Sequence, residues 1–127
     1  MKVLLIEPDK VLAKTYMAYL KLQGFEVFYA AGAQGAVHII DSKEPDVIVL
    51  EMQLARHNGI EFLYELRSYS DWQHIPVIAH TLIAPAGMSL SRELLRALGV
   101  VQYLYKPATS LMKLRRTITE VLQPATA

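Results

Sequence analysis

Apolar residues follow two patterns along this chain, short continuous runs and longer stretches with helical spacing. The runs have the length of strands that are buried on both faces, and each run is followed by an amphipathic stretch. The predicted strands are Lys2–Ile6, Glu26–Ala30, Val47–Leu50, Val77–His80 and Val101–Leu104. This alternation predicts an α/β domain with a parallel sheet covered by helices on both faces.

The stretches between the runs carry apolar residues every three or four positions, which is the spacing of one helix face. The clearest stripes are Leu12, Tyr16 and Leu20, then Leu90, Leu94 and Leu98, and finally Leu111, Leu114, Ile118 and Val121. Asn58-Gly59 is a turn signal and places the start of another helix near Ile60. We expect one domain over residues 1–122 and a C-terminal tail over residues 123–127.

The composition is that of a globular protein, because 53% of the 127 residues are hydrophobic and 20% are charged. The 13 basic residues nearly balance the 12 acidic ones, so the chain has no broad basic face for direct nucleic-acid binding. It has no cysteine, and its histidines at 38, 57, 74 and 80 lack the spacing of metal ligands. No apolar run approaches the roughly 20 residues that span a bilayer, and the first run is too short for a signal peptide. We expect a cytoplasmic protein without a membrane partner.

Candidate chemistry lies just after the apolar runs, because ligands of parallel α/β sheets bind beyond the carboxyl ends of the strands. These positions bring together carboxylates, a hydroxyl and an ammonium group. They are Glu7, Pro8 and Asp9 after the first run, Glu51 after the third, Thr81 after the fourth and Lys106 after the fifth.

Four segments in this order resemble the receiver domain of two-component response regulators. They are VLLIEPDK at 3–10, PDVIVLEMQLARHNGIEFL at 45–63, IPVIAHT at 75–81 and GVVQYLYKP at 99–107. The resemblance implies a flavodoxin-like (βα)5 fold of three layers, with a parallel sheet in the order 2-1-3-4-5. It also implies a role in cytoplasmic phosphorelay signal transduction.

The family's phosphorylation site maps onto this chain position by position. In the family, an acidic pair after the first strand and an aspartate after the third hold Mg²⁺, and that aspartate receives a phosphoryl group from a histidine kinase. A hydroxyl and a lysine then contact the phosphoryl oxygens. The resemblance places the acidic pair on Glu7 and Pro8, the acceptor on Glu51, the hydroxyl on Thr81 and the lysine on Lys106.

Two of these positions depart from the family pattern. Pro8 has no side-chain oxygen, and the neighbouring Asp9 is better placed to cap a helix than to bind a metal. Glu51 is longer than aspartate by one methylene, and a shift of about 1 Å already costs on the order of 100-fold in rate. We therefore expect phosphotransfer to fail, Mg²⁺ to bind weakly or not at all, and the chain to have no cofactor and no catalytic activity.

Glu51 has two interpretations. Its carboxylate either imitates a phosphoryl group and biases the domain toward an active-like state, or pairs with Lys106 and only neutralises charge in a fixed scaffold. The sequence slightly favours the second, because mimicry also requires Thr81 to move inward.

The parts that transmit the signal are also open to more than one interpretation. Tyr103 matches the family's switch aromatic, or it is a half-buried strand residue. The apolar segment 82–88 is a partner surface, or it folds back over the pocket and buries Leu82 or Ile83. Val101 and Gln102 stand where some dimeric relatives have acidic residues, so a homodimer would need different contacts.

The sequence thus predicts a phosphorylation-independent interaction or regulatory module. Its partner would be a kinase, an effector domain or another signalling protein. One alternative is a working response regulator that accepts phosphate on Glu51 or Asp9. Another is a small flavodoxin-like enzyme or nucleotide binder, although no glycine-rich loop follows the first strand and Glu7-Pro8-Asp9 would repel phosphate.

Overall fold

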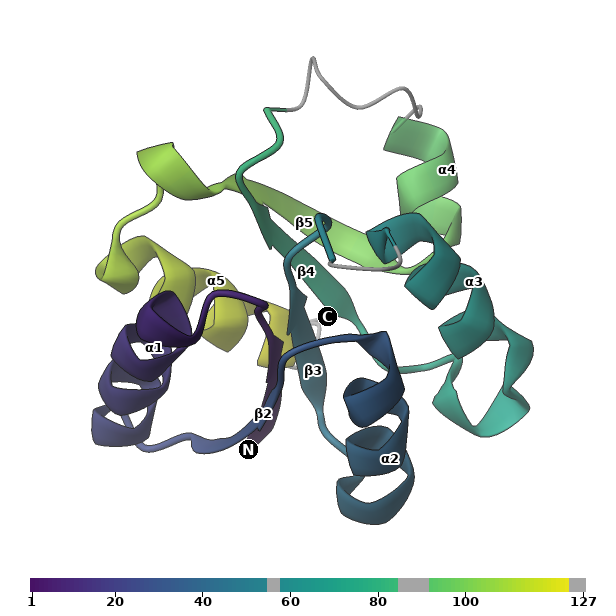
Figure 1. Cartoon of the computed structure of the whole chain (residues 1–127), viewed down its shortest axis with the longest axis horizontal. Coiled ribbons are helices and arrows are strands. Elements are labelled where there is room, and N and C mark those ends of the chain that lie inside the picture. Colours follow the sequence, from purple (N-terminus) through teal and green to yellow (C-terminus); the bar gives the residue numbers. More distant parts are fainter. Residues whose placement is uncertain (55–57, 85–91, 124–127) are drawn as a thin grey trace.

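A computed structural model describes residues 1–54, 58–84 and 92–123 of the chain (Figure 1). Five strands alternate with helices, as the apolar pattern predicts. The elements are β1 (Lys2–Ile6), α1 (Lys10–Leu22), β2 (Glu26–Ala30), α2 (Ala33–Lys43), β3 (Val47–Leu50), α3 (Gly59–Ser68), η1 (Ser70–Trp72), β4 (Val77–Thr81), α4 (Arg92–Ala97), β5 (Val100–Tyr105), η3 (Lys106–Ala108) and α5 (Leu111–Leu122).

The strands form one parallel sheet in the order β2-β1-β3-β4-β5, which is the flavodoxin-like order that the resemblance implies. The register aligns Ile6 with Ala30 and Leu50, and Thr81 with Tyr105. The carboxyl ends of β1, β3, β4 and β5 therefore open on the same edge of the sheet.

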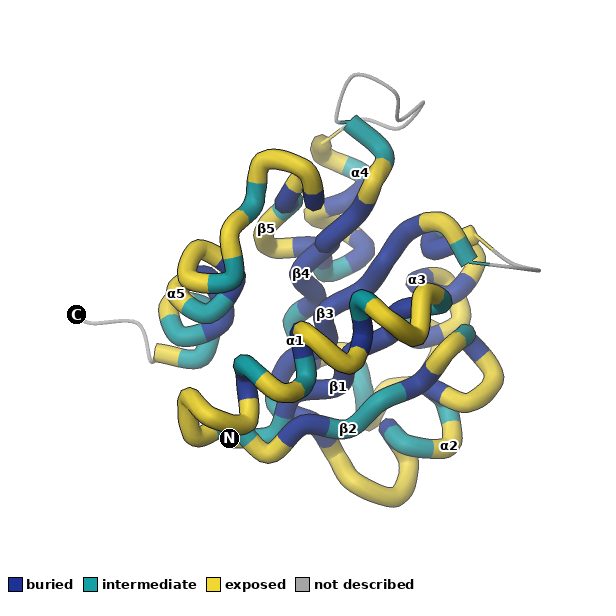
Figure 2. Tube along the Cα trace, turned by 60° about the vertical axis from the view of Figure 1, so that its left-hand side comes forward, coloured by how far each residue is buried: buried dark blue, intermediate teal, exposed yellow. Residues whose placement is uncertain are grey.

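The sheet divides the interior into two apolar layers, because successive strand side chains point to opposite faces. One layer packs Leu4, Ile48 and neighbouring strand residues against α2, α3 and α4. The other packs Leu5, Val49 and their neighbours against α1 and α5. The strands are consequently buried along most of their length, while the outer helix faces are exposed (Figure 2).

The predicted strand limits are correct for β1, β2 and β3, and short for the other two. β4 continues to Thr81, and β5 gains one residue at each end, Val100 and Tyr105. The structure adds the short 3-10 helices η1 and η3, which the pattern did not predict. Helix α5 ends at Leu122, and residues 124–127 of the expected tail lie outside the described part of the chain, as does Leu90 of the predicted stripe.

Arg67 joins three segments at the opposite edge of the sheet, where β4 and β5 begin. Its guanidinium donates hydrogen bonds to the carbonyl oxygens of Leu98 (2.8 Å), Ile75 (2.8 Å), Trp72 (3.0 Å) and Gln73 (3.2 Å). Gly99 makes room for this side chain, since a Cβ there would lie 1.9 Å from Nη2 of Arg67. Gly99 also has a φ of +88°, which other residues adopt with strain.

Candidate functional site

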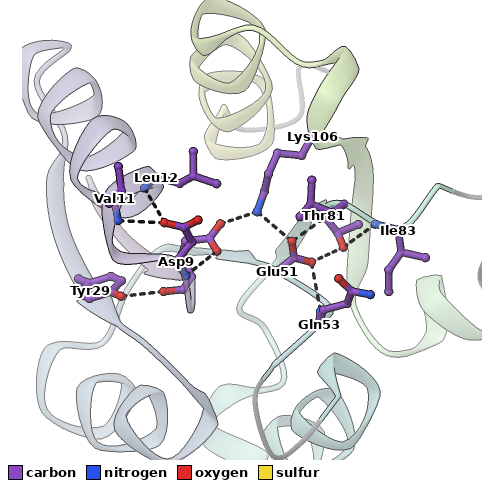
Figure 3. A network of polar contacts seen from close by, with 11 residues as sticks. Asp9, Val11, Leu12, Tyr29, Glu51, Gln53, Thr81, Ile83 and Lys106 are labelled. Atoms are coloured by element: carbon purple, nitrogen blue, oxygen red, sulfur yellow. Dashed lines mark hydrogen bonds and ion pairs between the residues drawn. The ribbon is translucent and has the colours of Figure 1, made fainter.

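The polar residues predicted from the strand ends meet at the carboxyl edge of the sheet (Figure 3). Glu7 follows β1, Glu51 follows β3, Thr81 ends β4, and Lys106 follows β5. All four side chains are buried, with no more than 7% of any residue exposed. Such burial is rare for charged residues unless they are paired.

Glu51 is held by donors from three directions. Its Oε1 accepts hydrogen bonds from Nζ of Lys106 (2.8 Å) and from the amide of Leu82 (3.1 Å). Its Oε2 accepts from the hydroxyl of Thr81 and from the amide of Gln53 (3.1 Å). An ionised carboxylate offers about four lone-pair sites. The carboxylate of Glu51 is therefore saturated by the protein itself.

Glu7 is the second acidic partner of Lys106. Nζ of Lys106 lies 2.5 Å from Oε1 of Glu7, so one ammonium bridges two carboxylates. The other carboxylate oxygen of Glu7 accepts from the amide of Asp9 (3.1 Å). The backbone of Glu7 is fixed from β2, where the hydroxyl of Tyr29 donates to its carbonyl oxygen (2.7 Å).

This pairing sets the protonation states of the buried ion pair. Burial alone would raise the pKa of Glu51, but hydrogen bonds from Lys106, Thr81 and Gln53 lower it below its ordinary value. Burial alone would lower the pKa of Lys106, but Glu51 and Glu7 raise it above its ordinary value. Glu51 and Lys106 are accordingly charged at neutral pH.

Asp9 caps helix α1, as the sequence predicts. Its Oδ1 accepts from the amides of Val11 (3.0 Å) and Leu12 (3.1 Å), two of the donors that a helix leaves unpaired at its start. The carboxylate of Asp9 therefore belongs to the helix terminus and makes no contact with Lys106.

The residues present do not fit a magnesium ion. Mg²⁺ requires an octahedral shell of oxygen ligands. Pro8 supplies no side-chain oxygen. The ammonium of Lys106 lies between the carboxylates of Glu7 and Glu51, and it therefore takes the place in which these two carboxylates would stabilise a metal ion. Over residues 1–54, 58–84 and 92–123, no group of three or more His, Cys, Asp or Glu side chains is arranged to hold a metal.

Comparison with known proteins decides the family. The sequence model of the response regulator receiver domain matches residues 3–119. The chain belongs to the receiver domain family. Receiver domains are modules of two-component signalling that interact with kinases and effector domains.

Curated relatives and solved structures agree with this assignment. The chain is 32% identical to the transcriptional regulatory protein CpxR of Klebsiella pneumoniae subsp. pneumoniae, over 84% of this chain and 43% of that protein. It is 28% identical to the polar-differentiation response regulator DivK of Brucella ovis, over 83% of each. The chain thus spans less than half of CpxR and most of DivK.

Among solved structures, the chemotaxis response regulator CheY4 of Vibrio cholerae superposes with a TM-score of 0.82 at 24% identity. This match covers 95% of this chain and 98% of that one. The signal receiver domain of a LuxO repressor protein from Vibrio parahaemolyticus gives a TM-score of 0.78 at 25% identity, over 95% and 88% of the two chains.

Thr81 and Tyr103 are linked to Glu51 through a short chain of hydrogen bonds. The hydroxyl of Thr81 donates to Glu51 and accepts from the amide of Ile83 (3.2 Å). The hydroxyl of Tyr103 donates to the carbonyl oxygen of Ile83 (2.6 Å). Tyr103 and Ile83 are both half-buried against the layer that α2, α3 and α4 cover.

Parts of the apolar segment 82–88 after β4 follow each of the two predicted arrangements, which are burial against the protein and exposure as a surface. Ile83 packs against the core, whereas Leu82 is 53% exposed. Residues 85–88 of that segment lie outside the described part of the chain. On β5, Val101 and Gln102 are exposed at the sheet edge.

His80 is packed, as expected. It is 2% exposed, and its ring meets that of Tyr16 edge-on, with the ring centres 5.0 Å apart. Burial, reinforced by the charge of Lys106, lowers the pKa of His80 to about 4.

The sequence did not predict two of the hydrogen-bond donors that surround the carboxylate of Glu51. The amides of Gln53 and Leu82 leave no signal in the sequence, because every residue except proline carries one. Tyr29 was also missed. Its position at the end of β2, the strand paired with β1, is a signal that locates it near Glu7.

Proposed function

We propose that this receiver domain works without phosphorylation, with the carboxylate of Glu51 in place of a phosphoryl group. The observation that carries the proposal is the donor set of Glu51, which consists of Lys106, Thr81 and the amides of Leu82 and Gln53. Lysine and hydroxyl are the two groups that contact phosphoryl oxygens in the family. Here they already contact a carboxylate that is part of the chain.

The same contacts argue against Glu51 as a phosphoryl acceptor. Attack on phosphorus requires a free lone pair, and the lone-pair sites of this carboxylate are taken by donors. The negative charge that builds up on a transferring phosphoryl group also needs a cation. The ammonium of Lys106 is engaged by Glu7 and Glu51, and Pro8 offers no oxygen to a metal.

The arrangement of Thr81 and Tyr103 favours the mimic over the fixed scaffold. Mimicry requires Thr81 to turn toward the acceptor position, and its hydroxyl donates to Glu51. Tyr103 is turned onto Ile83 and packs against the core layer. The domain would thereby present one state of its surface to a protein partner at all times, whether that partner is a kinase, an effector domain or a second copy of the chain.

The direct test is incubation with acetyl phosphate and Mg²⁺, followed by intact mass measurement. The expected result is an unchanged mass, while a receiver domain with an aspartate acceptor, treated in parallel, gains one phosphoryl group. A stoichiometric gain in this chain that disappears in Glu51→Ala or Asp9→Ala would overturn the proposal. It would establish instead a working acceptor at that residue.

A second measurement tests the mimic separately. The amides of Leu82 and Ile83 donate to Glu51 and Thr81, so both should exchange slowly with deuterium in the native chain. The Glu51→Ala variant should lose this protection, whereas Glu120→Ala, an exposed change on α5, should keep it. Equal protection in the native chain and in Glu51→Ala would leave Glu51 without a role in the switch.

A further inference from the structure

A groove runs between α2 and the segment formed by α3 and η1, outside the site at the carboxyl edge. It consists of two adjoining hollows of about 420 Å³ and 430 Å³ that share Val37 and His38 of α2. Helices α2 and α3 lie side by side on the same face of the sheet (Figure 1). Neither hollow is lined by Glu7, Glu51, Thr81 or Lys106.

The two hollows have an apolar floor. Ala33 and Phe62 are buried and Val37 is half-buried, and all three line the groove. At one end stand Tyr69 and Trp72, whose rings lie 4.3 Å apart between centres at an angle of 39°. Tyr69 is 45% exposed, so an aromatic face is available to a ligand.

The rim of the groove is acidic. Asp41 and Asp71 line one hollow, and Glu61 and Glu65 line the other, while among residues 1–54, 58–84 and 92–123 no lysine or arginine lines either hollow. The whole chain has a formal net charge of +1, so this concentration of carboxylates does not follow from the overall composition. A ligand complementary to the groove carries positive charge.

The end of the groove that carries Tyr69 and Trp72 is held in place by hydrogen bonds from Arg67 to backbone carbonyl groups. Arg67 donates to the carbonyl oxygens of Trp72 (3.0 Å) and Gln73 (3.2 Å), and thereby fixes η1 to the end of α3. Trp72 also packs against the core layer. A preformed site loses less conformational entropy on binding than a mobile one.

We propose that this groove binds a basic segment of a protein partner through arginine side chains. A guanidinium group stacks on aromatic faces and pairs with carboxylates, and both are found here at Tyr69, Trp72, Asp41 and Asp71. The apolar floor takes aliphatic side chains of the same segment, in the usual arrangement of an apolar centre and a polar rim. The partner is therefore an amphipathic basic peptide, and the acidic rim repels nucleic acid.

Trp72 makes the proposal directly measurable, because it is the chain's single tryptophan and lines the groove. The probe is a synthetic amphipathic peptide of arginine and leucine, titrated into the intact chain while Trp72 fluorescence is followed. A matched peptide with glutamate in place of arginine is the ligand control. The expected result is a saturable change with the arginine peptide alone, weakening as salt is raised.

Charge reversal locates the binding. Asp41→Lys with Asp71→Lys should weaken binding of the arginine peptide at least tenfold. Glu26→Lys with Glu120→Lys, which reverses two exposed charges on β2 and α5, should leave binding within twofold. The proposal is overturned if both double variants lose affinity equally, if the glutamate peptide binds as well, or if no saturable change appears at millimolar peptide.

Discussion

The ammonium of Lys106 lies 2.8 Å from Oε1 of Glu51, and both groups are removed from water. Burying two charges is costly, and their attraction offsets this only when the remaining donors and acceptors are also satisfied. Here they are satisfied, because no buried side-chain nitrogen or oxygen in the described residues lacks a hydrogen-bond partner. The pair therefore acts as one unit with Glu7 and Thr81.

Removing the charge of Glu51 should destabilise the fold. Breaking a buried ion pair from one side typically costs about 3–5 kcal/mol, and Glu51→Ala should approach this range because it also leaves a cavity. Glu51→Gln should cost less, since the amide keeps the volume and part of the hydrogen bonding. Urea denaturation measures both, with the exposed Glu120→Gln expected within about 0.5 kcal/mol of the native chain.

The ion pair also predicts a plateau of stability against pH. The folded pKa of Glu51 is lowered, so its contribution is complete above its unfolded value of 4.5 and is lost as pH falls through the folded value. The folded pKa of Lys106 is raised, so its contribution is complete below its unfolded value of 10.5 and is lost as pH rises through the folded value. Denaturation across pH measures this, and Glu51→Gln should remove the part of the acid-side loss that Glu51 contributes.

His80 should produce a separate loss of stability in mild acid. Its pKa is about 4 in the fold and 6.5 when unfolded, so the unfolded chain binds the extra proton first and stability falls between these values. The expected loss is about 3 kcal/mol. His80→Phe keeps an aromatic ring against Tyr16 and should abolish this loss. An unchanged pH profile in His80→Phe would contradict the assignment.

Gly99 and Gly24 allow a matched comparison that tests the close approach of Gly99 to Arg67. Both have positive φ, so alanine at either position brings backbone strain of about 1–2 kcal/mol. A Cβ at Gly24 meets nothing within 4 Å, whereas at Gly99 it lies 1.9 Å from Nη2 of Arg67. Gly99→Ala should therefore cost about 3 kcal/mol or more, because displaced Arg67 leaves buried carbonyl groups unpaired. Equal melting temperatures for the two variants would show that Arg67 adjusts freely.

Asp9 offers a test of capping against metal binding. Asp9→Ala should lower the free energy of unfolding by about 1 kcal/mol, and Asp9→Asn should restore most of it, because asparagine also caps helices. Adding Mg²⁺ should leave the stability of all three proteins unchanged. A metal-dependent gain in the native chain that Asp9→Asn lacks would assign Asp9 to a metal site.

Much of the fold was readable from the sequence because buried parallel strands leave continuous apolar runs. The runs located β1, β2 and β3 to the residue. They were one residue short at the carboxyl end of β4, where Thr81 is polar, and at both ends of β5, where Val100 follows Gly99 and Tyr105 precedes Lys106. The strand order itself came from the family resemblance, since periodicity carries no information on which strands are neighbours.

The sequence predicted which residues form the site, but it predicted fewer of the contacts between them. The positions of Glu51 and Lys106 at the carboxyl ends of β3 and β5, on the same edge of the sheet, predicted their pairing. The inward turn of Thr81 and the contact of Tyr103 with Ile83 depend on rotamers and on backbone carbonyls, which no residue type specifies. For the same reason the sequence favoured simple charge neutralisation, and the mimic gained support only from the donor geometry.

The carboxylate of Glu51 is attached to its chain by carbon–carbon bonds, which water does not cleave. A phosphoryl group on a carboxylate hydrolyses, and that hydrolysis times the end of a signal. A signal that depends on the carboxylate of Glu51 is not ended by hydrolysis. A partner that recognises it would respond to the number of copies in the cell, so synthesis and proteolysis would do the work that kinase and phosphatase do elsewhere.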